Sequence, residues 1–181
     1  MYEVEVKVRA AHGPVRDALA AAGARDRGTV EQADTYYDAP HRSFAETDEA
    51  LRIRRERRDG ESVARLTYKG PLVEAASKTR EEVETGVESG DAIAAILDAL
   101  GFVPVETVRK VRHRFALDDY AVTLDEVTGL GEFVEVETEA ETIEPARRGA
   151  YEVLERLGLD PDEHVRTSYL GLLLERESGA Q

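Results

Sequence analysis

The sequence predicts one α+β domain in which eight antiparallel strands close into a barrel, with helices packed outside. Three observations lead to this prediction. Seven segments alternate charged with apolar residues, which is the spacing of β-strands, and an eighth, at 28–38, looks extended. Turn signals such as Asp59-Gly60 join neighbouring segments as antiparallel hairpins. The remaining periodic segments have helical spacing, and two of them stop at glycines, so they are short helices beside the strands.

The first half of the chain contains five of the predicted strands. Glu3, Glu5 and Lys7 alternate with valines, and Gly23 is typical of a helix end. Asp59-Gly60 is a hairpin turn between two of the strands. In chain order, we expect a strand at 2–9, a helix at 14–23, an extended segment at 28–38, a loop at 39–50, and strands at 51–58, 62–69 and 79–88.

The second half adds three strands and three helices. Its first helix has a capping signal at its start and ends at Gly101, and Pro145 suits the first turn of the next helix. Asp118-Asp119 and the tight Gly129-Leu130-Gly131 turn separate the strands. In chain order, we expect a helix at 89–101, strands at 107–117, 119–127 and 132–140, a helix at 145–157 and a short packing helix in TSYLGLLLE.

Length and composition limit the classes of function. The 181 residues suffice for one domain with a sizeable core, and no linker or repeat divides them, so we expect one domain at 1–176 and a frayed tail at 177–181. With 24 basic and 38 acidic residues, the net charge of -14 repels phosphate and argues against general nucleic-acid binding. No membrane span or signal peptide is evident, and the lack of cysteine excludes disulfides and thiolate zinc sites. We therefore expect a cytoplasmic protein that binds neither nucleic acid nor membrane.

Lysine is rare among the basic residues. Only Lys7, Lys69, Lys78 and Lys110 are present, and the other twenty basic residues are arginines. Each lysine lies in or next to a strand-like stretch of alternating charge. An acid-rich, lysine-poor composition suggests adaptation to high salt, which screens self-repulsion, whereas a high-GC coding bias also favours arginine over lysine. The first interpretation predicts that the fold loosens when salt is removed.

The charged faces of the predicted strands are segregated by sign. Carboxylates dominate the first and last strands, and bases dominate three strands between them. A solvated sheet face also alternates polar with apolar residues, but it interleaves the two signs to limit repulsion. The charged faces contain Glu3, Glu5, Lys7, Arg52, Arg54, Arg65, Thr67, Lys69, Lys78, Arg80, Glu82, Glu84, Lys110, Arg112, Arg114, Thr123, Asp125, Glu135, Glu137 and Glu139.

A closed barrel accommodates both kinds of charged face. Its valine face packs outward against helices, and its charged face lines a tunnel. Arginine forks and lysines in the tunnel would hold a polyphosphate. Paired carboxylates at one end would hold Mg²⁺ or Mn²⁺ through oxygen. The sequence therefore predicts a site for a polyphosphate together with a divalent metal.

Seven segments of the chain form an ordered set. The first is the stretch Glu-Val-Glu-Val-Lys at residues 3–7, a motif so short that alone it occurs by chance. The other six are TYYDAPHRSFAETDEALRIRRE, LTYKGP, SKTREEVE, VRKVRHRF, LDEVTGLGEFVEVE and TSYLGLLLE. Together and in this order they resemble the CYTH superfamily of triphosphate tunnel enzymes, whose ExExK signature the first segment is similar to, and the resemblance extends over nearly the whole chain.

The resemblance implies roles for matched positions, and all of them lie on the charged faces. The implied metal ligands are Glu3, Glu5, Glu135 and Glu137, with Asp125 and Glu82 as second candidates for metal binding or for orienting the bases. The implied triphosphate-binding residues are Lys7, Arg52, Arg54, Lys69, Arg80, Lys110 and Arg112, although the strand at Arg80 can also begin after it. The implied catalytic residues are Glu3, Glu5, Lys7 and Asp125.

The resemblance implies a Mg²⁺- or Mn²⁺-dependent enzyme acting on ATP, thiamine triphosphate or tripolyphosphate, but it leaves the reaction open. In a class IV adenylyl cyclase, the ribose 3′-hydroxyl of ATP attacks the α-phosphorus, and 3′,5′-cyclic AMP and pyrophosphate form. In a triphosphatase, water attacks the terminal phosphorus. The chain length and the Ser-Tyr-x-x-Leu ending resemble the cyclase branch slightly more, so we expect a cyclase ahead of a triphosphatase. A non-catalytic polyphosphate-binding or nucleotide-binding module is the third alternative.

The oligomeric state is a separate question. An exposed apolar strand edge would suit a homodimer.

Several aromatic residues have structural interpretations. We expect Tyr36 and Tyr37 to anchor the core or a loop, with stacking against a base as the alternative. We expect Tyr169 and the leucines after it to pack a helix against the barrel. The four histidines lack the spacing of metal ligands.

Overall fold

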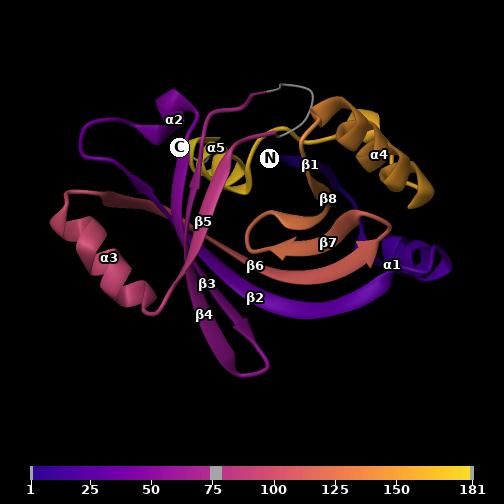
Figure 1. The fold of residues 1–181 in the computed structure, drawn as a ribbon, viewed down its shortest axis with the longest axis horizontal. Coiled ribbons are helices and arrows are strands. Elements are labelled where there is room, and N and C mark those ends of the chain that lie inside the picture. Colours follow the sequence, from indigo (N-terminus) through magenta and orange to yellow (C-terminus); the bar gives the residue numbers. More distant parts are fainter. Residues whose placement is uncertain (1, 74–78, 180–181) are drawn as a thin grey trace.

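The computed structural model describes residues 2–73 and 79–179 and shows one eight-stranded antiparallel sheet that curls back on itself (Figure 1). The order across the sheet is β1-β8-β7-β6-β2-β3-β4-β5. All eight expected strands are present. They are β1 (Tyr2–Arg9), β2 (Arg25–Asp38), β3 (Ala50–Arg58), β4 (Glu61–Lys69), β5 (Glu82–Val87), β6 (Val103–Leu117), β7 (Tyr120–Val127) and β8 (Gly131–Ala140).

The expected closed barrel is confirmed only in part. Within the described residues, the edge strands β1 and β5 form no ladder with each other, and one isolated bridge, between Glu3 and Arg80, joins these two sides of the sheet. Strand β5 begins at Glu82, later than the expected residue 79, and is six residues long. A barrel requires its edges to pair along their length, so the architecture is a curled half-barrel.

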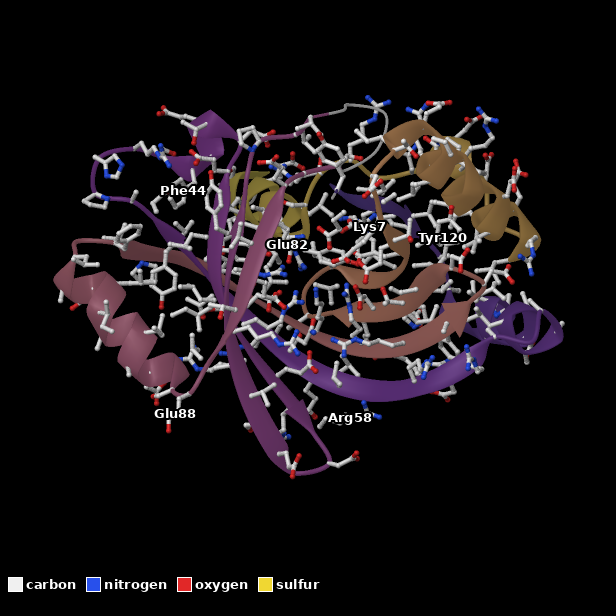
Figure 2. The ribbon with its side chains drawn as sticks, viewed as in Figure 1. Lys7, Phe44, Arg58, Glu82, Glu88 and Tyr120 are labelled. Carbon is white, nitrogen blue, oxygen red and sulfur yellow. The ribbon has the colours of Figure 1, made fainter. Side chains whose placement is uncertain are left out.

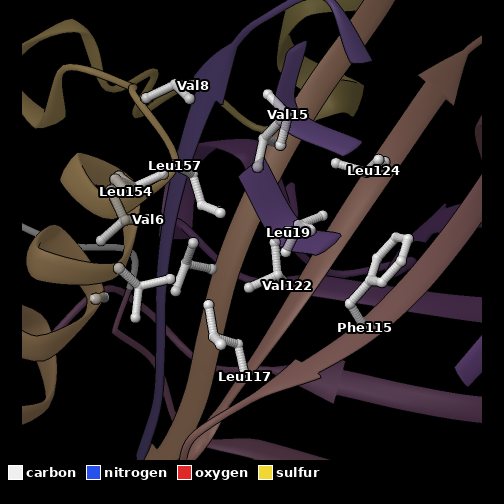
Figure 3. Close-up of a cluster of buried hydrophobic side chains, with 14 residues drawn as sticks. Val6, Val8, Val15, Leu19, Phe115, Leu117, Val122, Leu124, Leu154 and Leu157 are labelled. Atoms are coloured by element: carbon white, nitrogen blue, oxygen red, sulfur yellow. The ribbon is translucent and has the colours of Figure 1, made fainter. Parts of the chain in front are cut away.

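The valine face of β1 packs outward, as the sequence predicts. Val4, Val6 and Val8 are buried, and helices α1 (His12–Ala21) and α4 (Ile143–Arg156) cover this part of the sheet (Figure 1). Figure 3 shows the resulting core, to which the helices contribute Val15, Leu19 and Leu154. The strands and the turn after α4 contribute Val6, Val8, Phe115, Leu117, Val122, Leu124 and Leu157. Burial of each such side chain contributes about 1.5–3 kcal/mol, so this outward packing fixes which face of β1 turns inward.

Two further helices pack against other parts of the sheet. Helix α3 (Gly90–Ala99) packs its buried Leu97 with Ile53 of β3, and Ser89 caps it by accepting a hydrogen bond from the Ala92 amide at 3.1 Å. Helix α5 (Tyr169–Gly179) places Tyr169 in a cluster with Val108, Val127 and Phe133. This arrangement confirms the expected packing of Tyr169.

The expected loop at 39–50 contains a short helix, α2 (Phe44–Thr47), which the sequence prediction missed. Phe44 is buried, and its amide donates to Asp38 Oδ1 at 2.7 Å, so tertiary contacts hold this turn in place. A 3₁₀ turn, η1 (Pro161–Glu163), is a second unexpected element. Among the described residues, no helix has the length and apolar character needed to cross a membrane.

Candidate functional site

The concave face of the sheet borders a cavity of about 520 Å³ with a mostly charged lining. Figure 2 shows Lys7 and Glu82 among the nitrogen- and oxygen-tipped side chains that gather inside the curve of the sheet. Strand alternation places these residues inward because the residues between them face the outer core. The predicted site residues that line the cavity are Glu3, Glu5, Lys7, Arg52, Arg54, Lys69, Arg80, Glu82, Lys110, Arg112, Glu135 and Glu137. Lys78 lies outside the described residues.

Three carboxylates form a compact cluster at the β1–β8 junction. Glu5 and Glu137 are cross-strand partners, and Glu3 lies two residues along β1 on the same face. Each residue offers one oxygen, and these oxygens lie within 4.8 Å of one another. Burial raises the pKa of Glu137 to about 7, with added repulsion from neighbouring carboxylates, and burial also raises the pKa of Glu3. Three oxygen donors in a site that disfavours their negative charge fit a hard divalent cation such as Mg²⁺ or Mn²⁺.

Glu135 and Asp125 engage Arg112 instead of joining that cluster. Arg112 donates to both oxygens of Asp125, at 2.7 and 2.6 Å, and to Glu135 at 2.5 Å. Asp125 is fully buried and does not line the cavity, whereas Glu135 and Arg112 do. The Tyr169 hydroxyl donates to Asp125 Oδ2 at 2.9 Å. Asp125 therefore lies behind Arg112 and fixes its orientation, which matches the second role that the resemblance implies for it.

Two buried lysines lie close to the ring of Tyr169. The Lys7 ammonium is 4.1 Å from the ring centroid and donates to the Thr167 carbonyl at 2.9 Å. The Lys110 ammonium is 5.1 Å from the same centroid. Burial and the charge of Arg112 lower the pKa of Lys110 to about 8. Tyr169 thus contributes to the site as well as to packing, a contact that only the quoted Ser-Tyr-x-x-Leu segment could have signalled.

Sequence reasoning also missed Asp34, a buried residue of β2. Its two oxygens accept hydrogen bonds from Arg54, both at 2.7 Å, and Arg52 and Lys110 approach it at 3.5 and 3.8 Å. Burial alone would raise the pKa of Asp34, but the hydrogen bonds of Arg54 and the nearby positive charges hold it well below its usual value. Asp34 is the single acidic residue in the segment Gln32–Tyr37, so no alternation of charge pointed to it.

The seam of the sheet has its own ion pairs. The Lys69 ammonium contacts Glu3 at 2.5 Å and Glu82 at 2.8 Å, which joins β4 to both edge strands. Arg80 donates to Asp48 and to the Gly70 carbonyl. These contacts place Glu82 beside the carboxylate cluster but tie it to Lys69.

The cavity lining also includes aromatic and apolar residues from β2, α2, β3, β6 and α5. They are Tyr36, Tyr37, Phe44, Leu51, Val105, Leu170 and Leu174. Tyr36 and Leu170 pack against one buried cluster, and Tyr37 and Leu51 pack in another. Tyr37 also belongs to the buried core, as expected. The same cavity therefore presents buried cations, a carboxylate cluster and a surface for an organic ring.

Fold and site together define a class of α+β proteins in which a curled antiparallel sheet surrounds a charged cavity. The family model for the CYTH domain matches residues 1–169. The chain belongs to the CYTH domain family.

Known relatives agree with this assignment. A protein of Methanocaldococcus jannaschii named "Putative adenylate cyclase MJ0240" is 38% identical over 176 residues, which cover 95% of this chain and 98% of that protein. The adenylate cyclase CyaB of Aeromonas hydrophila is 27% identical over 77% of this chain and 70% of its own length. The solved PH1819 protein of Pyrococcus horikoshii is 38% identical, with a TM-score of 0.90 over 96% of this chain and 99% of that one.

Proposed function

We propose that the protein is a metal-dependent enzyme that acts on a triphosphate bound in the cavity. The observation that carries this proposal is the meeting, in one cavity, of the Glu3–Glu5–Glu137 cluster with the buried cations Lys7 and Lys110. A triphosphate with a divalent cation satisfies both groups at once, because its oxygens can face the bases and the cation together. Such a ligand would also offset the cost of burying several charges of each sign in one place.

Different residues of the cavity would bind the phosphates and the metal. Lys7, Arg52 and Lys110 line the cavity and would donate to the phosphate oxygens, where burial strengthens each contact. Arg112, fixed by Asp125, would add a guanidinium in a set orientation. Glu3, Glu5 and Glu137 would hold the metal, which supplies Lewis-acid neutralisation of the phosphate charge when bound. In phosphoryl chemistry, positioning and charge stabilisation of this kind are the main contribution of the protein.

Adenylyl cyclase is the first candidate for the reaction. The relatives named as adenylate cyclases, one of them 38% identical over nearly the full length, support it. Tyr36 and Leu170, which line the cavity and pack against the same buried cluster, would give the adenine ring a surface to contact. The ribose 3′-hydroxyl would then attack the α-phosphorus, and pyrophosphate would leave from the lysine- and arginine-lined side.

A triphosphatase is the second candidate. A protein of Hippeastrum named as a putative adenylyl cyclase with a dominant triphosphatase activity has the same fold, with a TM-score of 0.70 at 19% identity. The carboxylates and bases of the cavity would serve attack by water on the terminal phosphorus as well as attack by a ribose hydroxyl. Thiamine triphosphate or tripolyphosphate would then be the substrate.

Product analysis tests the proposal. Purified protein is incubated in molar KCl with Mg²⁺ or Mn²⁺ and with ATP, thiamine triphosphate or tripolyphosphate, and a chelator serves as the control. We expect cyclic AMP and pyrophosphate from ATP, and no product with the chelator. Orthophosphate without cyclic AMP would overturn the cyclase and support the triphosphatase. No product from any of the three would overturn both and favour a binding module.

A further inference from the structure

Asp34 occupies a central position behind one wall of the cavity. It lies on β2, the strand that joins the β1-β8-β7-β6 half of the sheet to the β3-β4-β5 half. Its side chain is fully buried and does not line the cavity. Arg52, Arg54 and Lys110, the three cations around it, all line the cavity. The carboxylate is therefore on the protein side of these cations, and a ligand would contact the cations without touching Asp34.

Asp34 makes short contacts with one cation and longer contacts with two others. Arg54 is its cross-strand partner on β3 and makes two hydrogen bonds of 2.7 Å, the paired geometry that fixes a guanidinium plane. Arg52 and Lys110 approach only to 3.5 and 3.8 Å. One carboxylate thus holds one arginine firmly and two further cations loosely, which leaves positive charge directed at the cavity.

Arg52 supplies an independent sign that an anion belongs here. Its side chain is buried, and its Nη1 makes only long contacts, at 3.5 Å, to Asp34 and to the Tyr36 hydroxyl. Its Nε has no hydrogen-bond partner among the described residues. A buried guanidinium N–H without an acceptor is costly, and a phosphate oxygen in the cavity would satisfy it.

The same design occurs around Arg112. Asp125, also fully buried, fixes Arg112 through two hydrogen bonds from the opposite half of the sheet. Asp125 lies in one of the segments that resemble the family, whereas Asp34 precedes the nearest such segment by one residue. Two buried aspartates, one on β2 and one on β7, thus each fix one arginine that lines the cavity.

We propose that Asp34 is a positioning residue that orients Arg52, Arg54 and Lys110 toward a triphosphate. The inference rests on the proposed function for the ligand class, and it adds a residue that does not touch the ligand. Fixed cations bind a polyanion better than mobile ones because less ordering remains to be done on binding. A carboxylate that only neutralised charge would have the opposite effect, since it would weaken the attraction between the cavity and an anion.

Metal-free binding of tripolyphosphate separates these two roles by the sign of the change. Calorimetry compares wild type with Asp34→Asn, which removes the charge, and with Asp34→Glu, which keeps the charge but displaces it. Positioning predicts that both variants bind about tenfold more weakly, while the stoichiometry stays at about one per folded chain. Tighter binding by Asp34→Asn, or an unchanged affinity in both variants, would overturn the inference. A defect in folding alone lowers the stoichiometry and leaves the affinity unchanged, and that result would overturn it too.

Glu31→Gln is the matched control. Glu31 lies on the same strand, and it also accepts two hydrogen bonds from one arginine, Arg57, at 3.0 and 2.7 Å. That pair is exposed and does not line the charged cavity. We expect its affinity for tripolyphosphate to stay within about twofold of wild type, because exposed pairs contribute little. Absence of binding by wild type would overturn this inference and the proposed function together, whereas binding without turnover of any triphosphate would overturn only the proposed reaction.

Discussion

Glu3, Glu5 and Glu137 crowd their oxygens within 4.8 Å, and this crowding has an energetic cost at the scale of single residues. Burial disfavours the charged form of Glu137 and raises its pKa to about 7. The Lys69 ammonium offsets part of the charge of Glu3, but burial still raises the pKa of Glu3. Such a cluster lowers the stability of the fold, and carboxylates with raised pKa values are typical of functional sites. Its carboxylates are therefore the first residues to test.

Replacement of Glu5 by Gln tests the carboxylate cluster. The amide has the same shape but carries no charge, so we expect metal-dependent turnover to fall more than about 100-fold, beyond the loss typical of removing a partner outside the coordination shell. Circular dichroism should show an intact fold. Glu139→Gln is the control, because Glu139 lies on β8 with the same strand parity as Glu137 but is exposed and does not line the cavity. Full activity in Glu5→Gln would refute the assignment of Glu5.

The raised pKa of Glu137 predicts a pH-dependent affinity for the metal. Below about pH 7 this carboxyl is protonated, and a cation can bind only by displacing the proton. Affinity for Mn²⁺ should therefore increase as the pH rises through 7 and level off above it. Calorimetry in two buffers of different ionisation enthalpy should detect proton release at about pH 6 and little at about pH 8. Because the pKa of Glu3 is raised as well, Glu137→Gln should reduce this proton release without removing it, and a release of unchanged size in Glu137→Gln would contradict the assignment.

The alternation of charge along each strand predicted most of the lining residues because it determines which face a side chain occupies. It did not reveal which strands are neighbours. Arg54 and Lys110 meet at Asp34 only because β2 lies between β3 and β6, a pairing that no local pattern encodes. Asp125 shares the inward parity of the site but lies too deep to reach the cavity, since Arg112 covers it. Depth along a side chain is a property of packing and was not predictable.

At the scale of elements, a hydroxyl of helix α5 contacts the carboxylate that orients Arg112. Tyr169 packs its ring edge-on against Phe133 with centroids 5.0 Å apart, and its hydroxyl reaches across to Asp125 on β7. The packing of the helix was predictable from the apolar run after Tyr169. The hydrogen bond was not, because Asp125 is 44 residues away in the chain. A single contact thus links the position of α5 to the orientation of Arg112.

Replacement of Tyr169 by Phe should weaken that link without loss of ring packing. Hydrogen bonds to charged groups are worth about 1.5–3 kcal/mol and neutral ones about 1 kcal/mol. We therefore expect Tyr169→Phe to lower the free energy of unfolding by roughly 2 kcal/mol. Tyr120→Phe is the control, because the Tyr120 hydroxyl donates to a neutral carbonyl, that of Ala146, at 2.9 Å. Denaturant unfolding measures both variants, and an equal loss in the two would show that the charge of Asp125 does not strengthen this contact.

Closure of the sheet is the element-scale feature that the sequence did not determine. Eight strands with one charged face suit a barrel, but closure depends on whether the edges β1 and β5 run side by side. In the structure, side chains do most of that joining: Lys69 bridges Glu3 and Glu82 across the gap. The strand pattern therefore predicts the curl and the inward charge, whereas the seam depends on contacts between residues that are far apart in the chain.

At the scale of the whole molecule, the cavity and the exterior differ in charge balance. As far as the chain is described, nine basic and nine acidic residues line the cavity. The net charge of -14 is therefore carried by the remaining residues, most of which face solvent or lie at the edges of the core. The cavity lining is balanced in charge, and this leaves the exterior acidic and self-repelling.

Salt should stabilise the fold if this repulsion is important. The Debye length falls from about 10 Å at 0.1 M salt to about 3 Å at 1 M, so molar KCl screens repulsion between neighbouring acidic side chains. We expect the melting temperature at neutral pH to rise by roughly 5 °C between dilute buffer and molar KCl, which corresponds to about 1.5–2 kcal/mol for a chain of this size. Thermal melts followed by circular dichroism measure the change.

A second melt series near the isoelectric point separates screening from general salt effects. The sequence has an isoelectric point of about 4.8, and there the net charge, and with it the repulsion, is close to zero. The response to KCl should therefore shrink as the pH approaches that value, while any effect of KCl on water and apolar surface persists at both pH values. Equal stabilisation at neutral and acidic pH would contradict the screening argument. A neutral-pH stability that does not change with salt would favour coding bias as the cause of the arginine-rich, lysine-poor composition, because that cause requires no dependence on salt.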